Sequence, residues 1–277
     1  MWLKRKPSMT IPPPDTPIRA LLIDLDGVMY VGQTPIPGAA GFIRQVRQHA
    51  LPFLFLSNNP TLTPAQYAAK LGQMGVPAEA GHFWTSALAT ATWLRANAPP
   101  GAPVLVVGEA GLRHALVDGG MTLVDDWRTA AWVVASLDRQ VTWRHLADAA
   151  LAIQHGAAFV ATNADLTLPS EEGALPGGGA LVSLLQLTTG VTPLVIGKPQ
   201  RTMFEQALQQ LGCRAAETLM VGDRYETDIV GAQQAGLRTA AVLTGVTRAG
   251  EFAQATPPPD WVFSSIAGLG EILGFDD

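Results

Sequence analysis

Two carboxylates stand two positions apart directly after an apolar run, at Asp24 and Asp26 in "LLIDLDGV". Burying a charge is costly unless something compensates it. Two carboxylates ~4 Å apart also repel each other by roughly 4 kcal/mol at an effective dielectric near 20. The pair must therefore either point into water or lie beside a cation.

Three further polar clusters follow apolar runs elsewhere in the chain. They are Ser57, Asn58 and Asn59 after "FLFL", Lys198 after "PLVIG", and Asp223 after "TLMVG". Short apolar runs that alternate with helical segments predict parallel strands covered on both faces. Since the carboxyl ends of such strands form the crevice where ligands bind, the four clusters are expected at one site.

The elements that must position these residues are read from hydrophobic spacing. Strands are expected at 18–24, 53–56, 193–197, 218–222 and 239–243. Helices are expected at 38–50, 201–212, 227–236 and in 61–75, where Thr63 is the cap, Pro64 the first helical residue and Gly75 the stop. Residues 1–17 read as a loose tail rather than a signal peptide.

The middle of the chain has an alternation of its own. It contains helical spacing at 86–97 and 142–156, apolar runs at 103–108 and 130–136, and a glycine-rich close in "LPGGGA". We therefore expect a core of residues 18–85 and 187–277, with residues 86–186 inserted as a second α/β unit.

Bulk composition excludes several classes of protein. At 48% hydrophobic and 15% charged residues, the chain suits a compact globular fold rather than a disordered one. The net charge of −5 offers no footprint for nucleic acid or an anionic membrane. Cys213 is the only cysteine and fits a reducing cytoplasm, while the five histidines lack HxH and HExxH spacing, which argues against zinc. No run has the ~20 apolar residues of a membrane helix.

"GDRYETD" alone is moderately specific and the other motifs are weaker, but "DLDGV", "LSNNP", "GKP" and "GDRYETD" occur in this order, each after an apolar run. Together they resemble the four motifs of the haloacid dehalogenase superfamily of phosphohydrolases. "TSALATA", "VVGEAGL", "LPGGGALVSLL" and "AVLTGVT" are similar to its NagD-like, p-nitrophenylphosphatase-like branch. The resemblance covers residues 18–275. It implies an α/β fold: a Rossmann-like parallel-sheet core with an inserted α/β cap of the C2 type.

The resemblance also implies roles for the acids. Asp24 matches the nucleophile that forms an aspartyl-phosphate, and Asp26 the acid–base that protonates the leaving group and then activates water. Asp24, Asp223 and the backbone carbonyl of Asp26 match the Mg²⁺ ligands, an oxygen set that this ion prefers. Asp228 is expected to support its loop rather than bind metal.

The same comparison implies the phosphate-binding groups. The residues expected to bind substrate are Ser57, Asn58, Asn59 and Lys198. Lys198 also supplies a positive charge that keeps Asp24 ionised. The loop 161–178 is expected to influence substrate choice, and Glu171 or Glu172, if facing the site, would disfavour a second anionic group.

The function that follows is a Mg²⁺-dependent phosphatase for small phosphate monoesters: a nucleotide, a sugar phosphate, a phosphoglycolate-like acid or p-nitrophenyl phosphate. The expected partner is thus a small phosphorylated metabolite, and the branch admits a homodimer through the cap. One alternative is a haloacid dehalogenase, against which Asp26 argues, because that reaction needs no leaving-group protonation. Another is a non-catalytic phosphate or nucleotide sensor, against which the complete motif set argues.

Overall fold

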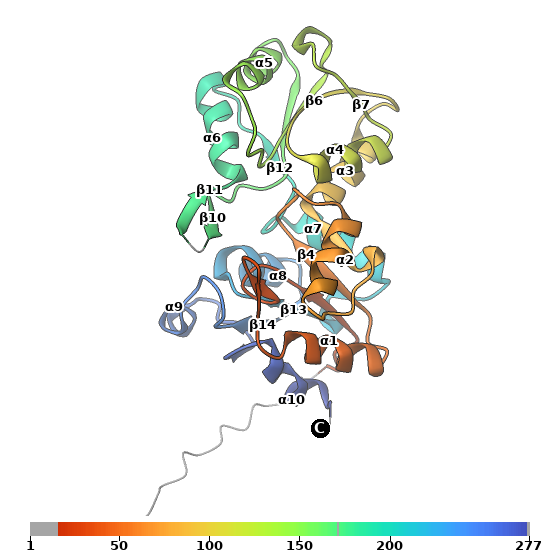
Figure 1. Cartoon of the computed structure of the whole chain (residues 1–277), viewed down its shortest axis with the longest axis vertical. Coiled ribbons are helices and arrows are strands. Elements are labelled where there is room, and N and C mark those ends of the chain that lie inside the picture. The colour runs from red at the N-terminus through yellow and green to blue at the C-terminus, as the bar shows by residue number, and fades with distance from the viewer. Residues whose placement is uncertain (1–15, 171, 276–277) are drawn as a thin grey trace, which may run out of the picture.

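The computed structural model describes residues 16–170 and 172–275, so most of the expected tail lies outside the described residues. Within those ranges the chain forms two parallel sheets, each covered by helices, and Figure 1 places one above the other. The predicted α/β class is confirmed. No helix in the described part of the chain is both long and apolar enough to cross a bilayer.

The larger sheet has six strands in the order β15-β14-β13-β1-β4-β5, and every neighbouring pair is parallel. Its strands are β1 (Ala20–Ile23), β4 (Phe53–Ser57), β5 (Phe83–Thr85), β13 (Thr218–Gly222), β14 (Arg238–Val242) and β15 (Trp261–Phe263). The helices of this part are α1 (Ala39–Gln48), α2 (Pro64–Gln73), α7 (Arg201–Leu211), α8 (Val230–Gln234), α9 (Ala249–Gln254) and α10 (Gly270–Leu273).

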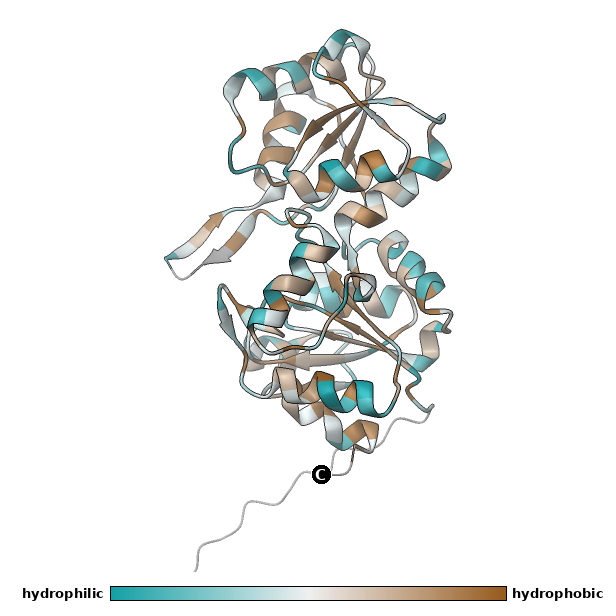
Figure 2. Cartoon of the chain, turned by 45° about the vertical axis from the view of Figure 1, so that its right-hand side comes forward, coloured by the Kyte–Doolittle hydropathy of each residue, from teal (hydrophilic) through white to brown (hydrophobic). Residues whose placement is uncertain are grey.

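Alternation along the strands explains why helices cover both faces of this sheet. Leu21 and Ile23 of β1 pack with α1 and α2 in one buried cluster. Leu22, between them, packs with α7 and α8 in another. Successive strand side chains point to opposite faces, so a strand buried on both sides is apolar throughout. Figure 2 shows hydrophobic strands inside and hydrophilic stretches on the outer helices.

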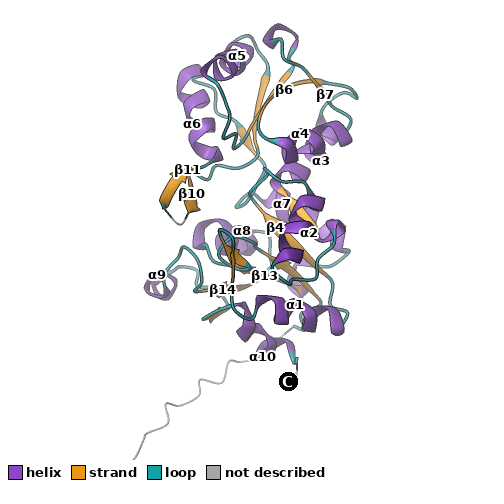
Figure 3. Ribbon diagram, in the orientation of Figure 1, coloured by secondary structure: helices purple, strands orange, loops and turns teal. Residues whose placement is uncertain are grey.

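The smaller sheet has five parallel strands in the order β12-β9-β8-β6-β7. Its strands are β6 (Pro103–Val107), β7 (Thr122–Leu123), β8 (Trp132–Ala135), β9 (Ala158–Ala161) and β12 (Leu194–Val195). Its helices are α3 (Ser86–Asn97), α4 (Ala110–Asp118), α5 (Trp143–Gln154) and α6 (Gly178–Thr189). Two hairpins complete the strands, β2 (Tyr30–Val31) with β3 (Thr34–Pro35) and β10 (Thr167–Ser170) with β11 (Gly173–Pro176). Figure 3 shows the second hairpin projecting beside the junction of the two sheets.

The two sheets share one hydrophobic cluster. It joins Leu22 and Leu54 of the six-stranded sheet to Val104 and Val134 of the five-stranded sheet. Helix α3 contributes Ala87 and further small residues to the same cluster, so it packs between the sheets. The junction is therefore a packed interface and can support a site lined from both sides.

One strand lies in a different sheet from the one expected. The run 193–197 was predicted as a strand of the core, but β12 pairs with β9 of the five-stranded sheet. Ile196 and Gly197 extend this pairing, since their amides donate to the carbonyls of Ala161 and Thr162. Hydrophobic spacing identifies a short strand but not its partner, and β5, which was not predicted, fills the edge beside β4. The division into core and cap stays a prediction, and the pairing of β12 favours a second boundary after residue 195.

Candidate active site

Three of the polar clusters lie at the carboxyl ends of adjacent strands. β4, β1 and β13 are neighbours in the six-stranded sheet and run parallel in register. Ser57 ends β4, Asp24 directly follows β1, and Asp223 directly follows β13. The strand ends therefore bring these side chains to one edge of the sheet, as predicted.

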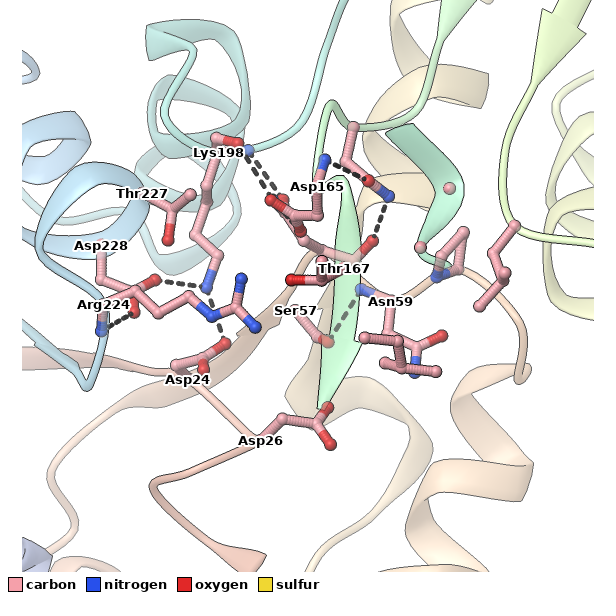
Figure 4. A pocket seen from close by; sticks show the side chains of 17 residues that line it. Asp24, Asp26, Ser57, Asn59, Asp165, Thr167, Lys198, Arg224, Thr227 and Asp228 are labelled. Carbon is pink, nitrogen blue, oxygen red and sulfur yellow. Dashed lines mark hydrogen bonds and ion pairs between the residues drawn. The ribbon is translucent and has the colours of Figure 1, made fainter. Parts of the chain in front are cut away.

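Lys198 reaches the same place from the loop after β12. Its Nζ lies 2.6 Å from Asp24 Oδ1 and 2.6 Å from Asp228 Oδ1, and it donates to the Leu56 carbonyl at 2.9 Å. Its side chain is only 3% exposed. Burial alone would lower the pKa of Lys198, but the charges of Asp228 and Asp24 raise it above its ordinary value. Lys198 is therefore a buried, protonated ammonium between two carboxylates (Figure 4).

Three buried acids gather around this ammonium. One carboxylate oxygen from each of Asp24, Asp223 and Asp228 lies within 4.8 Å of the other two. Burial raises the pKa of Asp24 well above its usual range, although Lys198 opposes the shift. Burial, together with the charge of Asp228, raises the pKa of Asp223 to about 7. The three carboxylates would repel one another when ionised, so a cation among them would stabilise the site.

Asp223 shows most directly that the acids fit a metal ion. Its Oδ2 accepts a hydrogen bond from the Val246 amide at 2.7 Å, whereas its buried Oδ1 has no hydrogen-bond partner among the described residues. Buried polar atoms are nearly always paired, so a free oxygen beside two more carboxylates suits an oxygen-preferring cation.

Two glycines leave room for the Asp223 carboxylate. A Cβ on Gly27 would stand 2.6 Å from Asp223 Cγ, and Gly27 has a φ of +84°, which favours glycine. A Cβ on Gly245 would overlap Oδ2 of the same side chain. The backbone of the "DLDG" turn and of the loop after β14 thus approaches the acid too closely for any side chain.

Asp26 stands apart from the three acids. It is half-buried at the rim of the pocket, and the Tyr30 hydroxyl points at its Oδ2 from 3.5 Å. Lys70 Nζ lies 3.6 Å from the centre of the Tyr30 ring. Burial raises the pKa of Asp26, and the charges of Lys70 and Arg224 counteract part of that rise. The carboxyl group of Asp26 therefore lines the pocket without belonging to the three-acid cluster.

The predicted substrate-binding amides have partners within the protein. Asn59 Oδ1 accepts hydrogen bonds from the backbone N–H of Thr61 at 3.1 Å and from the Thr61 hydroxyl at 2.8 Å. The backbone N–H of Asn59 donates to Ser57 Oγ at 3.1 Å. Tyr67 of α2 holds the same turn, because its hydroxyl donates to the Asn59 carbonyl at 2.9 Å. Helix α2 begins as predicted, with Thr63 and Gln66 in a reciprocal capping box. Direct contact of these amides with substrate stays a prediction.

A pocket of about 570 Å³, measured with its opening, connects these residues with the five-stranded unit. The residues that reach it from that unit include Leu137, Asn163, Asp165, Thr167, Leu168 and Gly177. Five of these lie in the loop 161–178, which was expected to influence substrate choice. Of the two glutamates considered there, Glu171 lies outside the described residues, and Glu172 is exposed and does not line the pocket.

Arg224 and Thr227 also line the pocket, and neither was predicted from the sequence. They belong to "GDRYETD", where residues Tyr225–Ile229 form a single π-helical turn. Such turns are rare and frequent at functional sites, but nothing in sequence spacing identifies one. Asp228, expected to support this loop, does accept from the Arg224 amide at 3.1 Å. It also binds Lys198, which had not been expected.

Comparison with known proteins gives consistent matches over about nine-tenths of the chain. A family model described as haloacid dehalogenase-like hydrolase matches residues 21–122, and a second model for HAD-like hydrolases matches residues 195–269. The chain is 42% identical over 248 residues to an acid sugar phosphatase of Staphylococcus saprophyticus, covering 90% of this chain and 95% of that protein.

Two solved structures extend the comparison to the fold. NagD from E. coli K-12 superposes with a TM-score of 0.84 at 32% identity, covering 91% of this chain and 98% of NagD. A glycerol phosphate phosphatase from Mycobacterium tuberculosis, solved in complex with magnesium, superposes with a TM-score of 0.86 at 39% identity. That match covers 91% of this chain and 76% of the other. Both agree with the NagD-like resemblance of the sequence.

Proposed function

Since the chain belongs to the haloacid dehalogenase-like hydrolases, we propose that it is a Mg²⁺-dependent phosphatase that hydrolyses small phosphate monoesters through an aspartyl-phosphate. The observation that supports this most directly is the pairing of a buried ammonium with Asp24. Lys198 Nζ lies 2.6 Å from Asp24 Oδ1, at the carboxyl end of β1 and beside two more buried acids. A positive charge placed there serves both the nucleophile and the phosphoryl group that it attacks.

The first step transfers the phosphoryl group to Asp24. An Asp24 carboxylate oxygen attacks phosphorus, the bond from phosphorus to the ester oxygen breaks, and the departing oxygen takes a proton from Asp26. Asp26 suits this donation because burial raises its pKa. Lys198 offsets the negative charge of the phosphoryl oxygens, and it opposes the rise that burial causes in the pKa of Asp24, which favours the carboxylate needed for attack.

The second step returns Asp24 to its starting state. Asp26, now a carboxylate, takes a proton from a water molecule that attacks the phosphorus of the acyl phosphate. The bond from phosphorus to the Asp24 oxygen breaks and inorganic phosphate is released. One residue thus acts first as acid and then as base, and both residues end as they began.

Asp24, Asp223 and the backbone carbonyl of Asp26 would hold Mg²⁺. When bound, the ion would neutralise the acids and offset the charge of the incoming phosphate dianion. The free Oδ1 of Asp223 supports this assignment. Asp228 stands beside the same acids but is held by Lys198 and the Arg224 amide, which favours a supporting role.

The pocket supports small substrates. Loops of the five-stranded unit close over the edge where Asp24 and Lys198 lie, so we propose that this unit acts as a cap that excludes folded phosphoproteins. Two relatives are named for sugar phosphate and glycerol phosphate, respectively. We therefore place the substrate among small phosphorylated metabolites. A cytoplasmic location and a homodimer through the cap stay predictions.

A phosphate-release screen with Asp24→Asn tests the proposal. We expect the protein to release phosphate from sugar phosphates, glycerol phosphate, nucleoside monophosphates or p-nitrophenyl phosphate with Mg²⁺, and none with EDTA. Asp24→Asn keeps the shape of the side chain but removes the nucleophile, so it should abolish turnover. Asp118→Asn, the same change at the exposed end of α4, is the control that should retain it. Turnover by Asp24→Asn would exclude the covalent route.

A further inference from the structure

The side chain of Asn58 forms hydrogen bonds with both backbone polar groups of Lys198. Asn58 Oδ1 accepts from the Lys198 amide at 2.8 Å, and Asn58 Nδ2 donates to the Lys198 carbonyl at 2.9 Å. One side-chain amide therefore satisfies both backbone groups of the residue whose ammonium meets Asp24. We infer that Asn58 is a positioning residue, which fixes Lys198 against the nucleophile and is itself held by Asp165 and Asn163 of the five-stranded unit.

Asn58 is held from the opposite side of the pocket. Its Nδ2 also donates to Asp165 Oδ2 at 3.0 Å, which uses the remaining proton of the amide. Its backbone carbonyl accepts from Asn163 Nδ2 at 2.8 Å and from the Ser86 hydroxyl at 2.7 Å. Asn163 and Asp165 belong to the loop after β9, so the loop that lines the pocket is bonded directly to the group that positions Lys198.

The packing around Asn58 leaves it little freedom. Asn58 is 9% exposed, and a Cβ on Gly197 would stand 2.6 Å from Asn58 Oδ1. The absence of a side chain at Gly197 is thus what lets the amide approach the chain before Lys198. A shift of the loop 163–165 would be passed to Lys198 through three hydrogen bonds of 3.0 Å or less.

The consequence rests on the proposed phosphatase function. A displacement of about 1 Å at a reacting group can cost about 10²-fold in rate even when the altered residue is remote from the chemistry. Lys198 meets the nucleophile Asp24 and would act in the chemical step, so loss of the Asn58 amide should lower kcat more than it raises KM. Because Asn58 Nδ2 also donates a hydrogen bond to Asp165, the position of the cap loop should affect the position of Lys198 as well.

Asn58→Ala tests the role of the amide, with Asn97→Ala as the control. Asn97 carries the same side chain at the exposed end of α3. We expect Asn58→Ala to lower kcat for glycerol phosphate by about 10²-fold, with KM changed by less than about threefold, and Asn97→Ala to match the parent. Circular dichroism and the rise in melting temperature on adding Mg²⁺ should be unchanged. A kcat within about twofold of the parent would overturn the inference.

A paired substitution separates positioning from general damage. In Asn58→Asp the new carboxylate faces the Asp165 carboxylate and the Lys198 carbonyl, so kcat should fall at least as far as in Asn58→Ala. Adding Asp165→Asn supplies a donor to the new carboxylate, and the double variant should regain about tenfold in kcat over Asn58→Asp alone. If the effects of the two substitutions on kcat multiplied independently, the proposed coupling between Asn58 and Asp165 would be contradicted.

A crystal structure of Asn58→Ala keeps this inference distinct from the proposed function. If the parent protein hydrolysed no phosphate ester, the proposed function would fail, and the position of Lys198 could still be measured. We expect its Nζ to move away from the 2.6 Å contact with Asp24 Oδ1. An unmoved Lys198 in that structure would overturn the positioning role whatever the activity.

Discussion

Lys198 balances the charge of the site. Its ammonium is 3% exposed and lies 2.6 Å from carboxylate oxygens of both Asp24 and Asp228. Removing one partner of a buried ion pair leaves an uncompensated charge and typically costs about 3–5 kcal/mol. A lysine placed for phosphate chemistry therefore also holds two acids in the folded protein, and substitutions there change stability and rate together.

Asp26 offers a cleaner test, because its side chain lies outside the three-acid cluster. Asp26→Asn removes the proton that the leaving oxygen needs, so kcat for an alkyl ester such as glycerol phosphate should fall by about 10²–10⁴-fold. p-Nitrophenolate leaves without protonation, so the first step with p-nitrophenyl phosphate should be much less affected. The rate of the burst of released glycerol or p-nitrophenolate under rapid mixing measures that step, because phosphate is released only in the second step.

The control for this comparison is the parent enzyme with both esters at the same Mg²⁺ concentration. Equal losses of the burst rate for alkyl and aryl esters would exclude Asp26 as the acid of the first step. A loss confined to the steady state with p-nitrophenyl phosphate is expected, since water activation in the second step still needs a base.

At the scale of elements, the strands whose carboxyl ends carry candidate site residues were largely predictable from the sequence. An unbroken apolar run followed by Asp24 or Asp223 marks a buried parallel strand and its active end, and β1, β4 and β13 lie where the sequence placed them. The same reasoning placed 193–197 in the wrong sheet, because pairing is a tertiary choice. Asn58 and Asn59 show a related limit: residue type indicates hydrogen bonding, but only the fold shows that Asn58 binds the backbone of Lys198.

The "DLDG" turn after β1 gives a prediction about close approach. Gly27→Ala would place a Cβ 2.6 Å from Asp223 Cγ, so the acid must move and Mg²⁺ should bind more weakly. The left-handed φ of +84° adds a stability cost on the order of 1–3 kcal/mol. Gly75→Ala is the matched control, because Gly75 has a φ of +75° with no atom within 4 Å of the added Cβ.

Both variants should lose thermal stability in EDTA, Gly27→Ala by at least as much as Gly75→Ala because of the added contact with Asp223, and only Gly27→Ala should need more Mg²⁺ for half-maximal phosphate release. Titration of activity with Mg²⁺ measures the difference. If Gly27→Ala needed no more Mg²⁺ than Gly75→Ala, a Cβ at residue 27 would not disturb the Asp223 carboxylate, and the prediction would be wrong.

For the whole molecule, the site depends on the junction of the two sheets. The six-stranded sheet supplies Asp24, Asp26 and Asp223, and the five-stranded unit supplies the loop with Asp165 and, through β12, the approach of Lys198. A shared hydrophobic cluster holds the junction together. The family resemblance implied that 161–178 would influence substrate choice, but which of its side chains turn into the pocket depends on the packing of the two units.

The stability of the whole protein should report the state of the acids. Burial raises the pKa of Asp223 from 3.8 to about 7 in the folded protein, so between these values the folded state binds a proton that the unfolded state lacks. This group's contribution to the free energy of unfolding is therefore present at low pH and is lost as pH rises toward 7. Mg²⁺ needs the ionised carboxylate, so its binding should strengthen over the same range.

We therefore expect the melting temperature in Mg²⁺ minus that in EDTA to grow from about pH 5.5 to about pH 8 and then level off. Differential scanning fluorimetry at matched ionic strength measures it. Asp223→Asn should abolish the Mg²⁺-dependent increment at every pH, while Asp118→Asn should retain the full dependence. An increment that stayed constant across this range in the parent protein would mean that no proton competes with the metal, and would contradict the raised pKa of Asp223.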